Sequence, residues 1–250
     1  MSGHSKWSQI KRQKGANDAK RGAVFTKIGR EISIAAREGG GDPDANFRLR
    51  LIMDKARAAN MPAENIKRAI DKAVGGSGAD QYEEITYEGY GPGGVAILVE
   101  TATDNKNRTA ADVRSVFAKA GGQLAGGGSV AWQFEPRGVI AVTRDGRDAD
   151  DIALAAIDAG ADDVDTESDP LEIVTAPGTL EAIRKSLESD GMPIESAEIT
   201  MQAKTPIDVD LNVANQNLRL IENLEDLDDV QRVTANFNLP AEILAEAATA

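Results

Sequence analysis

The chain has 250 residues, with 28 Lys and Arg against 41 Asp and Glu, one His and no Cys, which gives a formal net charge of −13. The lack of Cys excludes thiolate metal sites, disulfide-stapled folds and thiol nucleophiles. The single imidazole, His4, lies close to the chain start, which disfavours a His-based catalytic triad. The length predicts one to three domains that fold without staples. Because neither a long apolar run nor a secretory signal is present, we expect a soluble, cytoplasmic protein.

The first third of the chain has the apolar periodicity of three amphipathic helices. The first helix is expected at residues 17–38. Asp42 is expected to cap the second helix, with Pro43 at its first position. The third helix is expected at 62–74. The pattern therefore predicts a small helical domain with a basic exterior.

After a glycine-rich break at residues 75–78, the pattern changes to short strands that alternate with helices. In chain order we expect strands at 85–88 and 95–99, a helix at 109–120 and a strand at 130–134. Pro136 and Gly138 are then expected to interrupt the chain at a turn.

The stretch from 139 to 201 has the β-α-β-β-α-β order of a ferredoxin-like fold. We expect strands at 139–143, 163–166, 171–175 and 195–201, and helices at 150–159 and 178–189. The flanking pieces are each too small to close a sheet, so we expect them to pair around this insertion. The sequence thus predicts an α+β protein with a basic helical domain at 1–78, a discontinuous α+β domain at 79–134 and 205–250, and an inserted ferredoxin-like domain at 135–204.

Charge is distributed unevenly along the chain. Residues 1–75 carry 16 Lys and Arg against 8 Asp and Glu, a net of +8, whereas residues 76–250 carry 12 against 33, a net of −21. Such asymmetry is typical of a protein whose basic segment binds nucleic acid phosphate. The acidic remainder would then be repelled by phosphate and would orient the molecule. The alternative interpretation is a solvated basic helix.

Two further motifs favour structural interpretations. Residues 89–94 match G-x-G-x-x-G, but a strand follows where a dinucleotide site needs a helix, so we expect a hairpin turn. The acidic run at 145–169 offers oxygen ligands for a magnesium-dependent phosphodiesterase. Acids at a helix start also complement its dipole, and the run lacks EF-hand spacing, which favours a solvated surface. We therefore expect no enzymatic activity, no metal and no cofactor.

The polar segment 103–109 joins a predicted buried strand to a helix and is dense in groups that bond phosphate, bases or backbone. Asn105 and Arg108 are therefore candidates for a second nucleic-acid surface. The alternative is local, with Asn107 or Thr109 as the helix cap and Asp104 closing an Asx-turn.

Several motifs together cover nearly the whole length of the chain. They are Gly3-His4-Ser5-Lys6-Trp7, Phe25-Thr26-Lys27, Arg30-Glu31-Ile32, Ala59-Asn60-Met61-Pro62, Tyr87-Glu88-Gly89-Tyr90-Gly91-Pro92-Gly93-Gly94 and Thr103-Asp104-Asn105-Lys106-Asn107-Arg108-Thr109. With these motifs the chain resembles the YebC/PmpR family, whose mitochondrial relative is the translational activator of cytochrome c oxidase subunit I. The resemblance implies an N-terminal helical domain and two α+β domains, one ferredoxin-like and inserted into the other. Ser8-Gln9-Ile10 and the acidic second half depart from the family pattern.

The resemblance also implies a non-enzymatic regulator. Family members are described as DNA-binding transcriptional regulators, while others resemble ribosome-associated translation factors that assist synthesis through difficult stretches such as proline runs. Phosphate attraction is the same for DNA and ribosomal RNA, so the charge pattern favours neither partner, and no membrane partner is expected. The candidate nucleic-acid-binding residues are Lys6, Lys11, Arg12, Lys14, Lys20, Arg21, Lys27 and Arg30, with Asn105 and Arg108 at the second surface.

Overall fold

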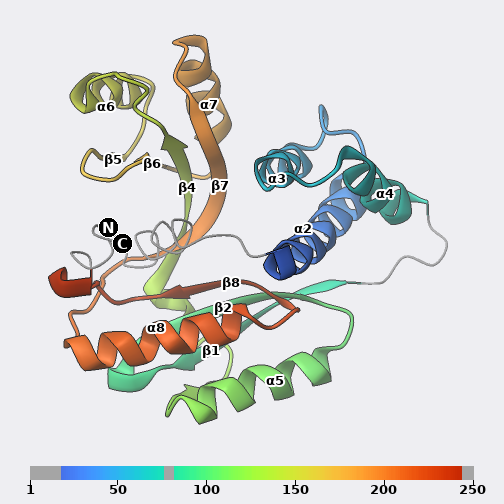
Figure 1. The fold of residues 1–250 in the computed structure, drawn as a ribbon, viewed down its shortest axis with the longest axis vertical. Coiled ribbons are helices and arrows are strands. Elements are labelled where there is room, and N and C mark those ends of the chain that lie inside the picture. The colour runs from blue at the N-terminus through green and yellow to red at the C-terminus, as the bar shows by residue number, and fades with distance from the viewer. Residues whose placement is uncertain (1–17, 76–81, 244–250) are drawn as a thin grey trace. The chain divides into compact units, whose positions relative to one another are not determined.

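A computed structural model of the chain describes residues 18–75 and 82–243 (Figure 1). It divides into two compact units, one formed by the described residues up to Glu135 together with those from Ala203 onward, the other by Pro136–Gln202. N-terminal helices precede two four-stranded sheets, which confirms the predicted α+β class. The exact limits of the three expected domains stay a prediction. Among the described helices, none combines the length and apolarity needed to cross a bilayer.

Three helices open the described chain: α2 (Asp18–Gly39), α3 (Phe47–Ala58) and α4 (Ala63–Val74). Their facing sides bury a shared core that includes Ile28, Ile32, Leu49 and Ile66. Each buried aliphatic side chain of this kind contributes about 1.5–3 kcal/mol. The apolar spacing in the sequence therefore predicted three helices in this part of the chain correctly.

Asn46, and not Asp42, caps α3. Its Oδ1 accepts a hydrogen bond from the amide of Leu49 at 3.1 Å, while its Nδ2 donates to two carbonyls at the C-terminal end of α2, each at 2.8 Å. Asp42 instead accepts from the amide of Asp44 in the preceding turn. An amide side chain offers both a donor and an acceptor, so Asn46 serves the end of one helix and the start of the next, which a carboxylate cannot do.

The first sheet has the strand order β3-β1-β2-β8, formed by β1 (Glu83–Tyr90), β2 (Ala96–Thr103), β3 (Gln123–Leu124) and β8 (Val230–Ala235). Helices α5 (Lys106–Lys119) and α8 (Leu211–Glu225) pack against it, and Val113, Phe117, Leu218 and Leu220 join its core. β2 pairs antiparallel with β8, with Leu98 opposite Thr234. The segments before and after the second unit therefore share one sheet, as predicted.

The glycine-rich segment 89–94 closes the β1–β2 hairpin. Tyr90 lies opposite Ala96, and a short 3-10 turn at Pro92–Gly94 connects the strands. Gly93 has a φ of 72°, a left-handed conformation that favours glycine. Because β2 follows this turn, the hairpin interpretation is confirmed.

The second unit contains β4 (Phe134–Val142), α6 (Ala149–Asp158), β5 (Asp163–Asp165), β6 (Leu171–Thr175), α7 (Leu180–Ser189) and β7 (Ile194–Ala203). Its strands are ordered β5-β6-β4-β7, with β6 antiparallel to both β4 and β5. This is the predicted ferredoxin-like arrangement.

The expected strand at 130–134 is wrong. Residues Ala131–Gln133 form a 3-10 turn, and β4 begins only at Phe134. The amides of Val130 and Ala131 donate to the carboxylate of Glu88, at 2.6 and 2.8 Å, so they are not available to a strand ladder. A contact from a distant part of the chain thus overrides the local β-preference.

The interruption expected at Pro136 and Gly138 is also wrong, because β4 runs through both residues. Pairing with β6 begins at Gly138, opposite Thr175, so the missing N–H of Pro136 removes no bond of that ladder. A Cβ atom on Gly138 would lie 2.3 Å from Thr175 Oγ1. The glycine permits close approach within the sheet and does not mark a turn.

Candidate nucleic-acid interface

The predicted phosphate-binding residues fall into two groups in the structure. Arg21 is exposed in the first part of α2, whereas Lys27 and Arg30 are partly buried further along it. The ammonium of Lys27 donates to the carbonyl of Glu225 at the end of α8. Outside the described residues lie Lys6, Lys11, Arg12 and Lys14, together with the side chain of Lys20.

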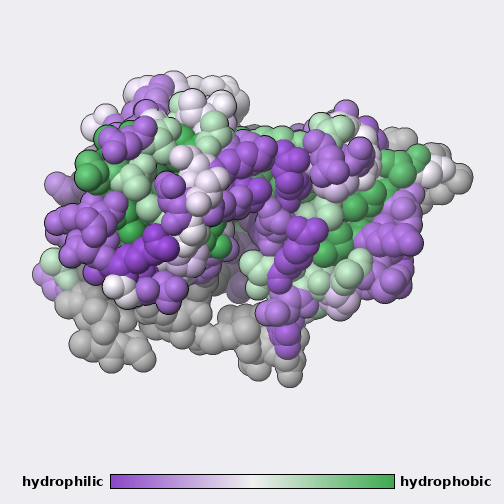
Figure 2. Space-filling model, turned by 90° about the horizontal axis from the view of Figure 1, so that it is seen from above, coloured by the Kyte–Doolittle hydropathy of each residue, from purple (hydrophilic) through white to green (hydrophobic). Residues whose placement is uncertain are grey.

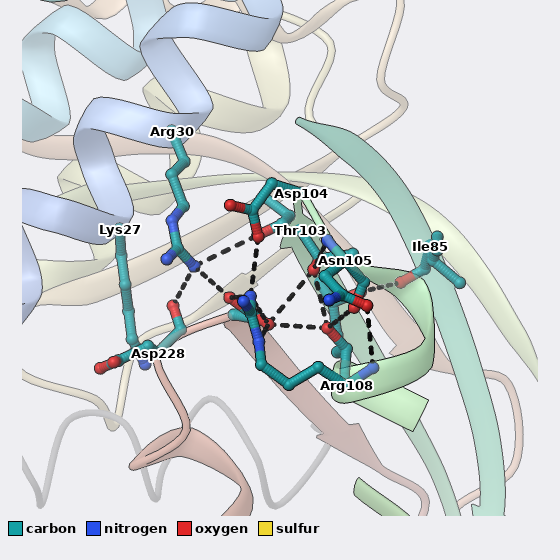
Figure 3. A network of polar contacts seen from close by, with 12 residues as sticks. Lys27, Arg30, Ile85, Thr103, Asp104, Asn105, Arg108 and Asp228 are labelled. Carbon is teal, nitrogen blue, oxygen red and sulfur yellow. Dashed lines mark hydrogen bonds and ion pairs between the residues drawn. The ribbon is translucent and has the colours of Figure 1, made fainter. Parts of the chain in front are cut away.

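Arg30 connects α2 to the first sheet. Its Nη1 lies 2.7 Å from Asp229 Oδ1 and also donates to the carbonyls of Asp228, at 2.6 Å, and Ala102, at 3.3 Å. Figure 3 shows its guanidinium directed toward the loop that carries Asp228. Only 13% of the side chain is exposed. Through these contacts Arg30 joins the helices to the sheet.

Arg108 approaches the same carboxylate from α5. Its Nη2 donates to Asp229 Oδ2 at 2.7 Å and to Asp104 Oδ1 at 2.8 Å (Figure 3). The hydroxyls of Thr109 and Thr103 also donate to Asp229 Oδ2, at 2.7 and 3.2 Å. Asp229 is therefore the centre of a cluster that we call the Asp229 cluster, formed by Arg30, Arg108, Thr103, Thr109 and Asp229.

The environment of Asp229 favours its ionised form. Burial alone would raise the pKa of its carboxyl group, but hydrogen bonds from Thr109 and Arg108, together with the charges of Arg30 and Arg108, outweigh burial and lower the pKa. The same contacts raise the pKa of Arg108. The carboxylate thus stays charged and holds two guanidinium groups in place.

The segment 103–109 has the local role that the sequence left open, but through other residues. Asn105 caps α5, with its Oδ1 accepting from the amide of Arg108 at 3.1 Å, in place of Asn107 or Thr109. Thr103 Oγ1 accepts from the amide of Asn105 at 2.9 Å and so closes the turn that was assigned to Asp104. Nucleic-acid binding by Asn105 and Arg108 stays a prediction, and a phosphate on Arg108 would compete with Asp229.

Sequence reasoning missed Asp229. It lies in an acidic run between α8 and β8, which reads locally as a solvated turn. Its partners come from residues more than a hundred positions away along the chain. A pattern in the neighbouring sequence could not have identified it.

Acidic residues of the second unit have local structural roles. Asp148 caps α6 by accepting from the amide of Asp150 at 2.8 Å, and Asp162 pairs with Arg137 at 2.9 Å. Asp165 accepts from the amide of Glu167 at 3.0 Å. In the described parts of the chain, no three acidic or His side chains are grouped so that they could hold a metal ion.

The visible surface is mostly hydrophilic. Figure 2 shows one face on which hydrophilic residues predominate and apolar residues form smaller patches. On α4, Lys67 and Arg68 are exposed, as are Arg48 and Arg57 on α3. Arg48 and Arg57 have carboxylate partners on the protein, Glu38 and Asp54 among them. A surface of this kind suits partners that are bound through charge and hydrogen bonds.

Two family models match the chain. The model described as the TACO1/YebC protein N-terminal domain covers residues 5–76, and the model described as the TACO1/YebC second and third domain covers residues 82–237. Together they span the helices, the first sheet and the ferredoxin-like unit.

Relatives are similar over almost their whole length. One from Rubrobacter xylanophilus is 53% identical over 99% of this chain and 100% of its own, and one from Moorella thermoacetica is 55% identical over 98% of both chains. Both carry the name "Probable transcriptional regulatory protein". The crystal structure of a conserved hypothetical protein from Aquifex aeolicus superposes with a TM-score of 0.85 at 45% identity, over 91% of this chain and 94% of that one.

Proposed function

Since the chain belongs to the TACO1/YebC family, we propose that it is a non-enzymatic, cytoplasmic regulator of transcription that binds DNA through its basic helical domain. The name shared by its relatives supports a regulatory role. Phosphate contacts would come first from the predicted basic arm, Lys6, Lys11, Arg12 and Lys14, and from Lys20, Arg21 and Lys27 behind it. Arg30 adds to this set, and Asn105 and Arg108 are secondary candidates at a second surface. A phosphate bound at Lys27, Arg30 or Arg108 would compete with a partner that the residue already has within the protein.

The observation that carries this proposal is the separation of charge along the chain. Residues 1–75 have a net charge of +8 and residues 76–250 a net charge of −21. A polyanion is attracted to residues 1–75 and repelled by residues 76–250, so binding would be confined to the first of these regions. Phosphate contacts position a protein without specifying a base sequence, so this attraction alone does not select a target.

Salt dependence of binding tests the proposal. If about six phosphates are neutralised, affinity for DNA should fall about 10³-fold or more between about 50 and 200 mM salt. Replacing Lys11, Arg12 and Lys14 by Ala should reduce the slope of log affinity against log salt by roughly three units. The measurement is fluorescence anisotropy of a labelled duplex with the full chain.

A matched control removes three positive charges from the central part of the chain. Arg114, Lys119 and Arg219 are exposed on α5 and α8, and their replacement by Ala should leave the slope close to that of the wild type. Equal slopes for the arm variant and the wild type would contradict the proposal.

Crosslinking in cells, followed by sequencing of both DNA and RNA, identifies the target class. Recovery of promoter fragments is the expected result. Recovery of ribosomal RNA without promoter DNA would replace the transcription proposal by the translation-factor alternative, which uses the same basic surface. Recovery of neither would contradict nucleic-acid binding in both forms.

A further inference from the structure

A groove of about 340 Å³ lies between α2 and α4. It is lined along one side by Phe25, Gly29 and Arg37 of α2 and along the other by Asn65, Arg68 and Lys72 of α4. Small-ligand sites have volumes of about 300–1,000 Å³. The groove is thus the size of one small molecule or one unit of a polymer, and too small for a second helix.

The lining of the groove is cationic. Arg37, Arg68 and Lys72 contribute cations to it, and none of the described lining residues is an Asp or Glu. Arg30 also lines the groove, but its charge is balanced by Asp229. Arg68 and Lys72 are one turn apart on α4, and both side chains are exposed. Guanidinium and ammonium groups arranged in this way favour a phosphate, which a guanidinium can bind with two parallel hydrogen bonds.

Aromatic and amide groups lie beside these charges. Phe25 is half-buried against the helical core, and Tyr82 is held by two arginines. The guanidinium of Arg30 lies over the Tyr82 ring, 5.3 Å from its centroid, and Arg37 donates to the Tyr82 carbonyl. With Asn65 adding a donor and an acceptor, the groove offers a stacking surface and polar groups next to its cations.

Gly29 is an independent indication that the groove is kept open. It lies in the middle of α2, where glycine destabilises a helix by about 0.5–1 kcal/mol relative to Ala. A Cβ atom added to Gly29 would meet no heavy atom within 4 Å, and its φ is not in the left-handed region. Neither packing nor backbone conformation therefore explains the glycine, whereas a side chain at this position would enter the groove.

We propose that the α2–α4 groove binds one unpaired nucleotide, with the base stacked at Phe25 and the phosphate on Arg68 and Lys72. This inference rests on the proposed nucleic-acid binding and adds a structural preference to it. A base inside a duplex has both faces covered by its neighbours, whereas a base in a single strand or loop is free to stack on the protein. The protein therefore prefers nucleic acid with unpaired bases over a blunt duplex of the same sequence.

The experiment compares the affinity of the full chain for a labelled single strand and for the same strand in a blunt duplex, with one DNA pair and one RNA pair. The wild type is expected to bind each single strand about tenfold more tightly than its duplex, as one stacked base provides. Equal affinities for DNA and RNA single strands identify the shared base and phosphate as the ligand. Tighter binding of the RNA single strand than of the DNA single strand would indicate an additional contact to the ribose 2′-hydroxyl.

Gly29→Leu fills the groove and Gly29→Ala is its matched control, since both substitutions raise helix propensity. The Leu variant should lose the single-strand preference, leave duplex affinity unchanged and unfold at a temperature no lower than the wild type. The Ala variant should keep most of the preference. Arg68→Ala should weaken single-strand binding several-fold more than Arg57→Ala, which removes an exposed cation of α3 that does not line the groove.

The outcomes separate this inference from the proposed function. Wild-type binding of duplex and single strand with equal, salt-dependent affinity overturns the groove and leaves the basic domain as a phosphate-binding surface. A Leu variant with the full single-strand preference also overturns it. If none of the probes shows salt-dependent binding, the proposed function is overturned, and the groove proposal with it.

Discussion

Asp229 and Asp104 both accept hydrogen bonds from the guanidinium of Arg108, at 2.7 and 2.8 Å, but their surroundings differ. The Asp229 side chain is 6% exposed and also holds Arg30, whereas that of Asp104 is 47% exposed. Removing one partner of a buried ion pair leaves a charge without compensation, while an exposed pair is weakened by water and salt. The two residues therefore form a natural comparison.

Asp229→Asn is expected to lower the free energy of unfolding by about 3 kcal/mol, because Arg30 and Arg108 lose their shared carboxylate. Asp104→Asn should lower it by less than about 1 kcal/mol. Urea denaturation of the two variants and the wild type at neutral pH measures both values. Equal losses for the two substitutions would show that the Asp229 cluster does not stabilise the fold through its buried charge.

At the level of single residues, the sequence predicted which segments make polar contacts better than it predicted which residue pairs with which. Segment 103–109 was identified from its composition, yet the structure uses Asn105 as the cap and Thr103 to close the turn. Asn, Thr and Asp have overlapping capping ability, so a few positions compete and packing decides. Asp229 was out of reach because its partners are brought to it only by the complete fold.

The glycine-rich loop before β4 is an element whose conformation depends on one carboxylate. Glu88 of β1 accepts hydrogen bonds from the amides of Gly128, Val130 and Ala131, at 2.6, 2.6 and 2.8 Å. Burial alone would raise the pKa of Glu88, but the backbone amides outweigh it and lower the pKa below its usual value. Directly after the loop, Trp132 is 68% exposed and provides an optical probe.

Acidification should release this loop in a defined pH range. Because the pKa of Glu88 is lowered in the folded state, its stabilising contribution is complete above the usual Glu value of about 4.3 and is lost as pH falls through the lowered pKa. In a Trp7→Phe background, Trp132 fluorescence should change with a midpoint below that usual value.

Glu88→Gln should abolish this fluorescence transition and give the acid-type signal already at neutral pH, because an amide cannot carry the charge that orders the loop. Glu84→Gln removes an exposed carboxylate from the same strand and should leave the transition in place. An unchanged midpoint in Glu88→Gln would assign the transition to other groups.

Among secondary-structure elements, those with strong periodicity were predicted best. Helices α2, α4 and α7 and the β1–β2 hairpin depend on apolar spacing and turn residues that are close in sequence. The expected strand at 130–134 failed because Glu88, some forty residues earlier, takes its amides. Continuity of β4 through Pro136 was missed because a proline signals a turn unless the partner strand is known.

At the scale of the whole molecule, the insertion was predictable because the two flanking pieces cannot each complete a sheet. Hydrogen bonds join the two chain segments of the first unit at the point where the second unit is inserted. The amide of Lys204 donates to the carbonyl of Gln133 at 2.8 Å, and its ammonium donates to the carbonyl of Trp132 at 2.9 Å. Chain segments on either side of the second unit therefore meet within the first unit, whose sheet β2 and β8 complete.

Replacement of residues 136–202 by a short Gly-Ser linker should therefore leave a first unit that unfolds in one cooperative transition, since a short loop between adjacent ends has a small closure entropy. The removed unit carries 5 Lys and Arg against 16 Asp and Glu. Its loss should tighten nucleic-acid binding several-fold at low salt, with the gain disappearing as salt screens the charges. Calorimetry and anisotropy measure the two effects. An aggregated product would show that the insertion is required for folding, and tightening that persists at high salt would show that the second unit blocks the interface sterically and not through charge.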